Sequence, residues 1–231
     1  MNLQTILAPA SRVTVIDDDE DGCEELMDIL SDFQFEPNAV RGSFDDRLGD
    51  LVAEIEAGDP SFVICDNRLQ ARQMAQFHGI EVVKVLVARQ RPAMLLTMYG
   101  SPDRLKLRPS RFEVPVIVHR DTFAGERLSE YYEVCRREIA ADPVDHRKPH
   151  RSLIRIDNIA RAERQIDVVI PGWRPEHAVP IPFECVAEEL HDVIGCGTYL
   201  LGDVNIGSHH EDELFFHNVN EIVPPPKEDL S

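Results

Sequence analysis

The chain has 231 residues, of which 43% are hydrophobic, and a formal net charge of −18. This length allows one large domain or two small ones with buried cores. Acidic residues outnumber basic residues in both halves. That balance disfavours nucleic acid as a partner, because phosphate backbones are bound by clustered Lys and Arg. No apolar run approaches the roughly 18 residues of a membrane-spanning helix, so we expect no membrane partner.

Cysteine usage and the N-terminus bear on where the protein works. The five cysteines are scattered and form no CxxC pair, which favours reduced core residues over a disulfide framework. The opening stretch MNLQTILAPASR has no basic residue before its short apolar patch, so we expect no signal peptide. Together these features predict a cytoplasmic location.

Two short apolar runs in the first half end abruptly in carboxylates. Residues 12–19 read RVTVIDDD, and residues 61–69 read SFVICDNRL. Each run predicts a strand that is buried on both faces. If the two strands are parallel neighbours, three or four carboxylates meet at one edge of the sheet. Like charges at ~4 Å repel by ~1–4 kcal/mol, so the cluster predicts a cation. Hard oxygen ligands of this kind favour Mg²⁺.

Helical and strand patterns alternate through the first 140 residues. Apolar spacing predicts four helices, at 20–31, 44–57, 79–88 and 124–139. Short apolar runs predict five strands, of which the second is weak: 12–19, 33–40, 61–69, 93–100 and 114–118. Alternation of this kind implies parallel pairing with right-handed crossovers. The predicted fold class is therefore α/β, a doubly wound five-stranded parallel sheet of the flavodoxin type, followed by a small mainly-β domain.

The first half resembles the response-regulator receiver domain, because four of its residues match the pattern of that family. In that family an acidic pair after strand one binds Mg²⁺ and an aspartate after strand three is phosphorylated. A Thr or Ser ends strand four, and a lysine ends strand five. Asp17 and Asp18 match the acidic pair, Asp66 matches the phosphoacceptor and Thr97 matches the hydroxyl. The resemblance covers about residues 11–140.

The resemblance implies a site, a cofactor and partners. Mg²⁺ would be held by Asp17, Asp18, Asp66 and the backbone carbonyl of Arg68, and Thr97 would contact a phosphoryl oxygen. The phosphodonor would be a histidine kinase or a phosphotransfer protein, and a homodimer is possible in this family. No catalysis is expected beyond phosphorylation and dephosphorylation of the chain's own aspartate.

Two departures from the family pattern lie at this site. The family lysine falls on His119, with Arg120 beside it. A histidine is charged only below a pKa near 6.5, and Arg120 replaces the lysine only if it turns inward, although strand neighbours usually point to opposite faces. In the loop after Asp66, Gln70 stands where the family has Pro, and the helix-starting Gly79 comes several residues late. The departures keep open a phosphorylation-independent pseudo-receiver that acts as an adaptor.

A second enzyme class shares part of the first motif. Asp17 and Asp19 have the spacing of the nucleophile and acid in haloacid-dehalogenase-type phosphatases. Those enzymes carry Thr or Val two residues after the second acid, where this chain has Asp21. They also need a later lysine and acidic pair that no position here matches, so the receiver interpretation is preferred.

The chain changes character after residue 141. We predict a receiver-like domain over 1–141, a linker over 142–151, a β-rich domain over 152–223 and a disordered tail over 224–231. Short alternating runs predict four to six strands in a barrel or sandwich. Prolines 180 and 182 make the run at 179–183 an edge strand at best.

The second half shows no recognisable output module. It has no helix-turn-helix with a basic second helix and no Gly-rich phosphate loop. His209, His210 and His217 with Glu211 lack a known metal-ligand spacing and are interpreted as surface residues. We expect this domain to contact a protein partner whose identity the sequence leaves open. A third alternative is an enzyme with its active site in this domain, for which no polar constellation is apparent.

Overall fold

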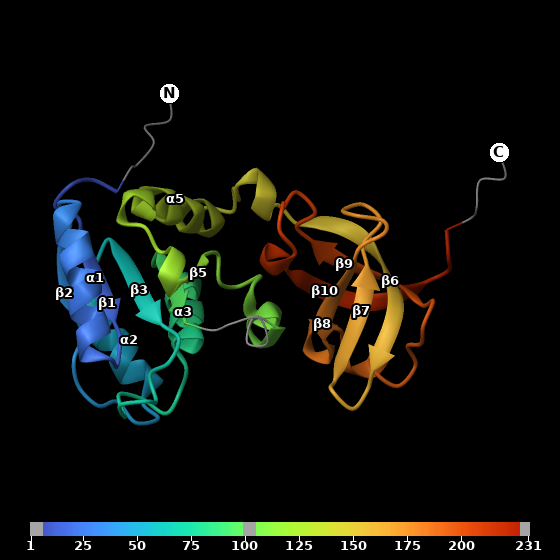
Figure 1. Ribbon diagram of the computed structural model, residues 1–231, viewed down its shortest axis with the longest axis horizontal. Helices are drawn as coiled ribbons and strands as arrows, with labels where there is room; N and C mark the ends of the chain where they lie inside the picture. Colours follow the sequence, from blue (N-terminus) through green and yellow to red (C-terminus); the bar gives the residue numbers. More distant parts are fainter. Residues whose placement is uncertain (1–6, 99–104, 227–231) are drawn as a thin grey trace. The chain divides into compact units, whose positions relative to one another are not determined.

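The computed structural model describes residues 7–98 and 105–226 (Figure 1). The chain divides into two compact units. The first contains Met1–Tyr99 and Glu113–Pro143, and the second contains Gly100–Phe112 and Val144–Ser231. The second unit thus takes a piece from inside the range 1–141 that was expected to form one continuous domain. The physical reason is contact between distant residues: Arg108 of this piece lies against the ring of Phe216, and Phe112 stacks on His217.

The first unit is a parallel sheet with helices on both faces. Its strands are β1 (Arg12–Ile16), β2 (Glu36–Ala39), β3 (Phe62–Asp66), β4 (Ala93–Thr97) and β5 (Ile117–His119), in the order β2-β1-β3-β4-β5. Its helices are α1 (Glu20–Asp32), α2 (Leu48–Ala57), α3 (Gly79–Ala88) and α5 (Leu128–Ile139). This arrangement confirms the predicted doubly wound five-stranded parallel fold. No helix in the described part of the chain is long and apolar enough to cross a bilayer.

Several predicted boundaries in the first unit move. The helix predicted over 44–57 begins only at Leu48, because the backbone of Phe44 and Asp45 pairs with Met74 and Ala75 instead. A short 3-10 turn replaces the start of the helix predicted over 124–139. The strand predicted over 114–118 is displaced to the last three residues before Arg120.

The sheet of the first unit buries both of its faces. On one face, apolar side chains from β1, β3 and β4 form a core with α1 and α5. Strand side chains alternate between faces, so the intervening residues, which are equally buried, point to the side covered by α2 and α3. Full burial of one such aliphatic side chain stabilises the fold by about 1.5–3 kcal/mol. Burial on both faces explains why the strands read as continuous apolar runs.

The second unit contains one antiparallel sheet. Its strands are β6 (His150–Ala160), β7 (Gln165–Val169), β8 (Ala178–Pro182), β9 (Tyr199–Val204) and β10 (Phe216–Val223), in the order β10-β9-β6-β7-β8. The predicted mainly-β character is confirmed, and the proline-containing β8 lies at an edge. Among the described residues no ladder joins β8 to β10, so the sheet is open. Strand β6 begins inside the predicted linker over 142–151.

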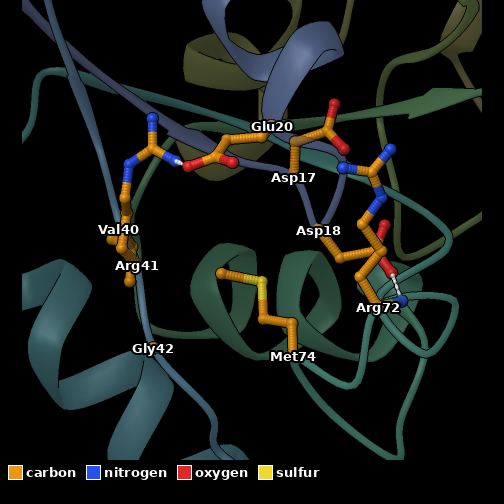
Figure 2. A pocket seen from close by; sticks show the side chains of 8 residues that line it. All are labelled: Asp17, Asp18, Glu20, Val40, Arg41, Gly42, Arg72 and Met74. Carbon is orange, nitrogen blue, oxygen red and sulfur yellow. Dashed lines mark hydrogen bonds and ion pairs between the residues drawn. The ribbon is translucent and has the colours of Figure 1, made fainter.

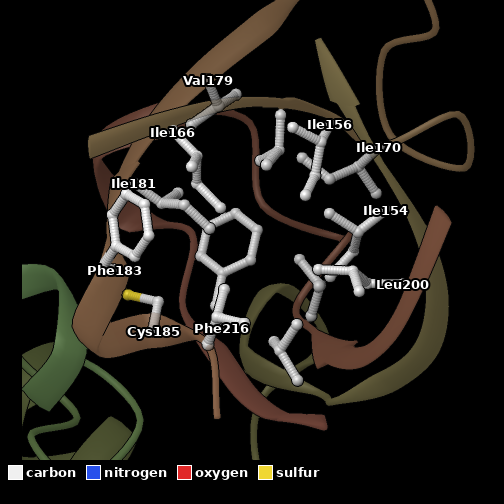
Figure 3. Close-up of a cluster of buried hydrophobic side chains, with 14 of the residues drawn as sticks. Ile154, Ile156, Ile166, Ile170, Val179, Ile181, Phe183, Cys185, Leu200 and Phe216 are labelled. Carbon is white, nitrogen blue, oxygen red and sulfur yellow. The ribbon is translucent and has the colours of Figure 1, made fainter. Parts of the chain in front are cut away.

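The predicted barrel or sandwich is therefore corrected to a single open sheet. Its apolar face is covered by the connections between strands and not by a second sheet. Phe183, Cys185 and Val186 come from the connection after β8, and Ile194 and Leu214 come from later connections. Figure 3 shows Phe183 and Cys185 at one end of this cluster, beside Ile181 of β8, and Ile154 of β6 and Leu200 of β9 at its other end. At the C-terminus, residues 224–226 have no regular structure, and the rest of the predicted tail lies outside the described residues.

One close approach in the first unit ties α3 to the end of β3. A Cβ atom on Gly79 would lie 1.9 Å from the carbonyl oxygen of Asp66 and 2.8 Å from Sγ of Cys65. The obstructing carbonyl belongs to a buried strand, so the backbone must shift if Gly79 gains a side chain. This contact explains why the helix starts at a glycine.

We therefore predict that Gly79→Ala lowers the free energy of unfolding by about 1–3 kcal/mol, the usual cost of overpacking. The measurement is urea denaturation of both variants and the wild type. The control is Gly49→Ala in α2, where a Cβ meets nothing within 4 Å, and where alanine stabilises a helix by up to about 1 kcal/mol. Equal effects of the two substitutions would contradict the packing argument.

Candidate functional site

Three carboxylates meet at the carboxyl edge of the parallel sheet. In the parallel pair β1 and β3, Ile16 lies beside Cys65, and an aspartate follows each of them in the chain. These aspartates, Asp17 and Asp66, are 9% and 7% exposed. Carboxylate oxygens of Asp17, Asp18 and Asp66, one from each residue, lie within 4.8 Å of one another. In the described part of the chain this is the one such group formed by Asp, Glu, His or Cys.

Burial and mutual repulsion raise the pKa values in this cluster. Desolvation first, and then the charge of Asp17, raise the pKa of Asp66 from 3.8 to about 6, against the opposing amide of Arg68 and the guanidinium of Arg120. Desolvation also raises the pKa of Asp17, although the Asp19 amide and Arg120 oppose it. At neutral pH Asp66 is still largely ionised. The carboxylates therefore repel one another in a partly buried site, which a cation relieves.

The cation that the structure places here is Arg120. It begins the short 3-10 turn η2 (Arg120–Thr122) directly after β5. Its Nη2 donates a hydrogen bond to Oδ2 of Asp17 and lies 3.5 Å from Oδ1 of Asp66. The alternation of side chains along a strand does not hold at this position, because the strand ends at His119 and the backbone turns. Arg120 therefore faces the carboxylates.

His119 and Thr97 lie side by side at the same edge. They are paired in the register of β4 and β5. Thr97 is buried, and it follows Leu96, the residue of β4 that pairs with Asp66 of β3. His119 accepts a hydrogen bond from the Asp121 amide, and its Nδ1 lies 3.6 Å from the Asp121 carboxylate. Its recorded partners are thus in the turn after β5, whereas Arg120 contacts the acids.

The backbone at Arg68 also lies at the site. Its amide donates to Oδ2 of Asp66 at 2.6 Å, which orients the carboxylate from the loop that follows β3. The amide of Asp19 likewise donates to Oδ1 of Asp17 at 2.9 Å. These two bonds fix both carboxylates from the backbone. Coordination of a metal by the Arg68 carbonyl stays a prediction.

The loop after Asp66 folds back over the acidic residues. The Arg72 amide donates to Oδ2 of Asp18 at 2.7 Å, and its Nη2 lies 2.6 Å from Oδ1 of Asp19. Asp18 and Arg72 line a pocket of about 170 Å³. Arg41 also lines this pocket, and it pairs with Glu20 at 3.2 Å. Figure 2 shows Arg41 and Arg72 on opposite sides of this pocket, with the acids between them. Sequence reasoning missed both arginines, because neither lies in a periodic stretch or at a family position.

Gly22 is a further residue that the sequence analysis missed. It lies in the first turn of α1, and a Cβ there would be 2.5 Å from Nη1 of Arg120 and 3.3 Å from Oδ2 of Asp17. The missing side chain leaves the space that the guanidinium occupies. A glycine inside a helix costs up to about 1 kcal/mol relative to alanine, and that unusual choice was the available signal.

The donor set fits Mg²⁺. Three carboxylate oxygens lie within reach of one ion, and oxygen ligands from one or two carboxylates, with waters, are what this ion takes in proteins. Asp18 is the most solvent-exposed of the three acids, so solvent can reach the site. The guanidinium of Arg120 shares Asp17 with any metal bound there.

The histidines of the second unit do not gather into a comparable group. His217 stacks on Phe112, and His177 pairs with Glu211 at 2.6 Å. Neither these nor His209 and His210 belong to a metal-competent group among residues 7–98 and 105–226. His209 and His210 are exposed, as expected of surface residues, whereas His217 is half-buried against Phe112.

Comparison with known proteins gives structural neighbours only. No family model matches the chain, and no curated protein does. Solved structures with similar folds include NtrX from Brucella abortus in complex with ADP (19% identity, TM-score 0.43). The match spans 57% of this chain but only 28% of NtrX. A response regulator receiver domain protein from Clostridium thermocellum matches over 57% of this chain and 98% of its own (14%, TM-score 0.43).

A third neighbour is TrrA from Thermotoga maritima in complex with Mg²⁺-BeF, with 20% identity and a TM-score of 0.40 over 54% of this chain and 98% of that one. With identities below 25% and TM-scores below 0.5, the fold assignment depends on the strand order of this chain and not on the neighbours. The order β2-β1-β3-β4-β5 with helices on both faces is the doubly wound order of the flavodoxin type. The first unit therefore has the doubly wound flavodoxin-type fold.

We predict that Gly22→Ala displaces Arg120 from Asp17 without unfolding the protein, because the obstructing atom is the end of a flexible side chain. Loss of one nearby positive charge should tighten Mg²⁺ binding about fivefold. That factor corresponds to ~1 kcal/mol, the energy of two unit charges at ~4 Å in water. Isothermal titration calorimetry measures the affinity. Gly49→Ala, a glycine in open space on α2, should bind Mg²⁺ like the wild type; unchanged or weaker binding by Gly22→Ala would refute the argument.

Proposed function

We propose that this chain is an atypical response-regulator-like signalling protein in which Asp66 accepts a phosphoryl group. The observation that carries the proposal is the convergence of Asp17, Asp18 and Asp66 at the carboxyl edge of the sheet, with Arg120 reaching two of them. Open α/β sheets bind their ligands at this edge. The second unit is proposed to contact a protein partner in response.

The proposed reaction is phosphoryl transfer from a phosphohistidine of a histidine kinase or phosphotransfer protein. An oxygen of Asp66 forms a bond to phosphorus while the bond between phosphorus and the donor nitrogen breaks. The imidazole leaves with the electron pair and takes up a proton. The raised pKa of Asp66, about 6, leaves its carboxylate ionised and more basic than an exposed one, which suits a nucleophile.

The residues around Asp66 have separate proposed roles. Asp17, Asp18, Asp66 and the Arg68 carbonyl would hold Mg²⁺, which neutralises phosphoryl oxygens when bound. Thr97 would donate a hydrogen bond to a phosphoryl oxygen. Arg120 is proposed to supply the permanent positive charge of the missing lysine, since its guanidinium is always protonated and binds two oxygens of a phosphate.

A second candidate is a pseudo-receiver adaptor without phosphorylation. It is favoured by the arginine side chains that already offset part of the acidic charge: Arg120 on Asp17, and Arg72 on Asp19. A site whose negative charge is partly offset from within its own chain depends less on a metal or a phosphoryl group for stability. In this case the contact between the second unit and its protein partner would not depend on phosphorylation.

The deciding experiment is intact-mass spectrometry after incubation with acetyl phosphate and Mg²⁺. We expect the wild type to gain one phosphoryl group, and Asp66→Asn to gain none because its amide is not a nucleophile. Chelation of the metal should also abolish the gain. The matched control is Asp59→Asn, an aspartate whose side chain is 79% exposed, which should react like the wild type.

The alternatives give different results in the same assay. No gain by a wild type that binds Mg²⁺ in calorimetry favours the adaptor. A gain that survives in Asp66→Asn places the acceptor elsewhere and refutes the assignment of Asp66.

A further inference from the structure

The second unit is assembled from two separate pieces of the chain. Its first piece, Gly100–Phe112, lies in the sequence between β4 and β5 of the first unit, and the described part is Leu105–Phe112. Two side chains of this part are nearly buried: Leu107 is 6% exposed and Arg108 is 3% exposed. The guanidinium of Arg108 lies 5.9 Å from the ring of Phe216 in β10. The piece is therefore a built-in part of the second unit.

The end of this piece is held most firmly. The ring of Phe112 stacks on His217 of β10, with centroids 3.8 Å apart and planes 5° apart, and meets Phe215 edge-on at 5.2 Å. The buried guanidinium of Arg147 donates to the carbonyls of Arg111 at 3.0 Å and Phe112 at 3.4 Å. Ring contacts and backbone bonds together fix the position of Phe112 against β10.

The residues that follow Phe112 lead directly into the acidic site. Glu113 pairs with Lys84 of α3 at 2.6 Å, and Val114 is fully buried. Strand β5 comes next and ends one residue before Arg120. Arg120 thus stands eight positions after Phe112 in the sequence, and its guanidinium contacts two carboxylates of the site.

We propose that the stretch from Phe112 to Arg120 is a mechanical link that couples the acidic site to β10 of the second unit. One end is anchored by Arg120 on Asp17 and Asp66, and the other by Phe112 on His217. A ligand that draws Arg120 away from Asp17 moves the end of β5, and the displacement passes along the backbone to the ring stack. The link rests on the proposed function only for its natural trigger, phosphorylation of Asp66.

Strand β10 is suited to receive such a displacement. Its register against β9 shifts between His217 and Glu221, and Asn218 in this interval has a positive φ of 50°. Four steps along β10 in this interval face two steps along β9, so β10 carries extra unpaired residues, and such irregularities change the local bend and twist of a strand. β10 is also an edge strand, so a change in its register alters a surface that a partner protein can recognise.

The test is hydrogen exchange with mass spectrometry on the full chain, with and without Mg²⁺ and beryllofluoride as a phosphoryl mimic. In the wild type we expect peptides over 62–69 to respond and exchange over 216–223 to change about fivefold, the lower end of usual coupling between sites. In Phe112→Ala and His217→Ala the response over 62–69 should persist while that over 216–223 is lost. The control His177→Ala, whose ring partner is Trp173, should behave like the wild type.

A second measurement needs no phosphoryl mimic. Arg120→Ala releases the same anchor by mutation, so exchange over 216–223 should differ from that of the wild type in buffer alone. The link is overturned if this exchange is unchanged, if β10 is unaffected in a wild type whose site responds, or if the response survives in both ring variants. No response over 62–69 in the wild type would instead overturn the proposed function, and Arg120→Ala would still decide the link. Unchanged exchange over β6 and β7 verifies that each variant is folded.

Discussion

The acidic site of the first unit depends on the balance of charge between its buried carboxylates and one guanidinium. Asp17 and Asp66 are each less than a tenth exposed, and two like charges near 4 Å repel by ~1–4 kcal/mol. Arg120 offsets this repulsion, and the local structure makes room for it. Because β5 ends at His119, the chain turns and Arg120 faces the carboxylates. Gly22 has no side chain to obstruct the guanidinium. A second arginine, Arg72 in the loop after β3, pairs with the neighbouring carboxylate of Asp19.

This balance gives the site a character different from that of an open metal site. A guanidinium on a flexible side chain can exchange one oxygen partner for another, whereas a carboxylate fixed by a backbone amide stays in place. The acids here are of the fixed kind, held by the amides of Asp19 and Arg68. The proposed signalling chemistry depends on that asymmetry: the acids define the location, and Arg120 is the part free to respond.

Much of the first unit was predictable because its physics is local. Strands buried on both faces give continuous apolar runs, and the ends of parallel neighbours must meet at one edge, which brought Asp17 and Asp66 together in the prediction. What could not be predicted depends on contacts between distant residues. The inward direction of Arg120 follows from where β5 ends, and the space above Gly22 exists only in the folded protein. The membership of 105–112 in the second unit has no local signature.

That membership also orders events during synthesis. Residues 105–112 leave the ribosome long before Arg147, Phe215 and His217, with which they pack. The first unit is itself interrupted by this piece, since β5 and α5 follow it in the chain. Until β10 has been made, the nascent chain carries Leu107 and Phe112 without their final environment, which is exposed apolar surface of the kind that chaperones bind. A protein with its units joined end to end would not pass through such a stage.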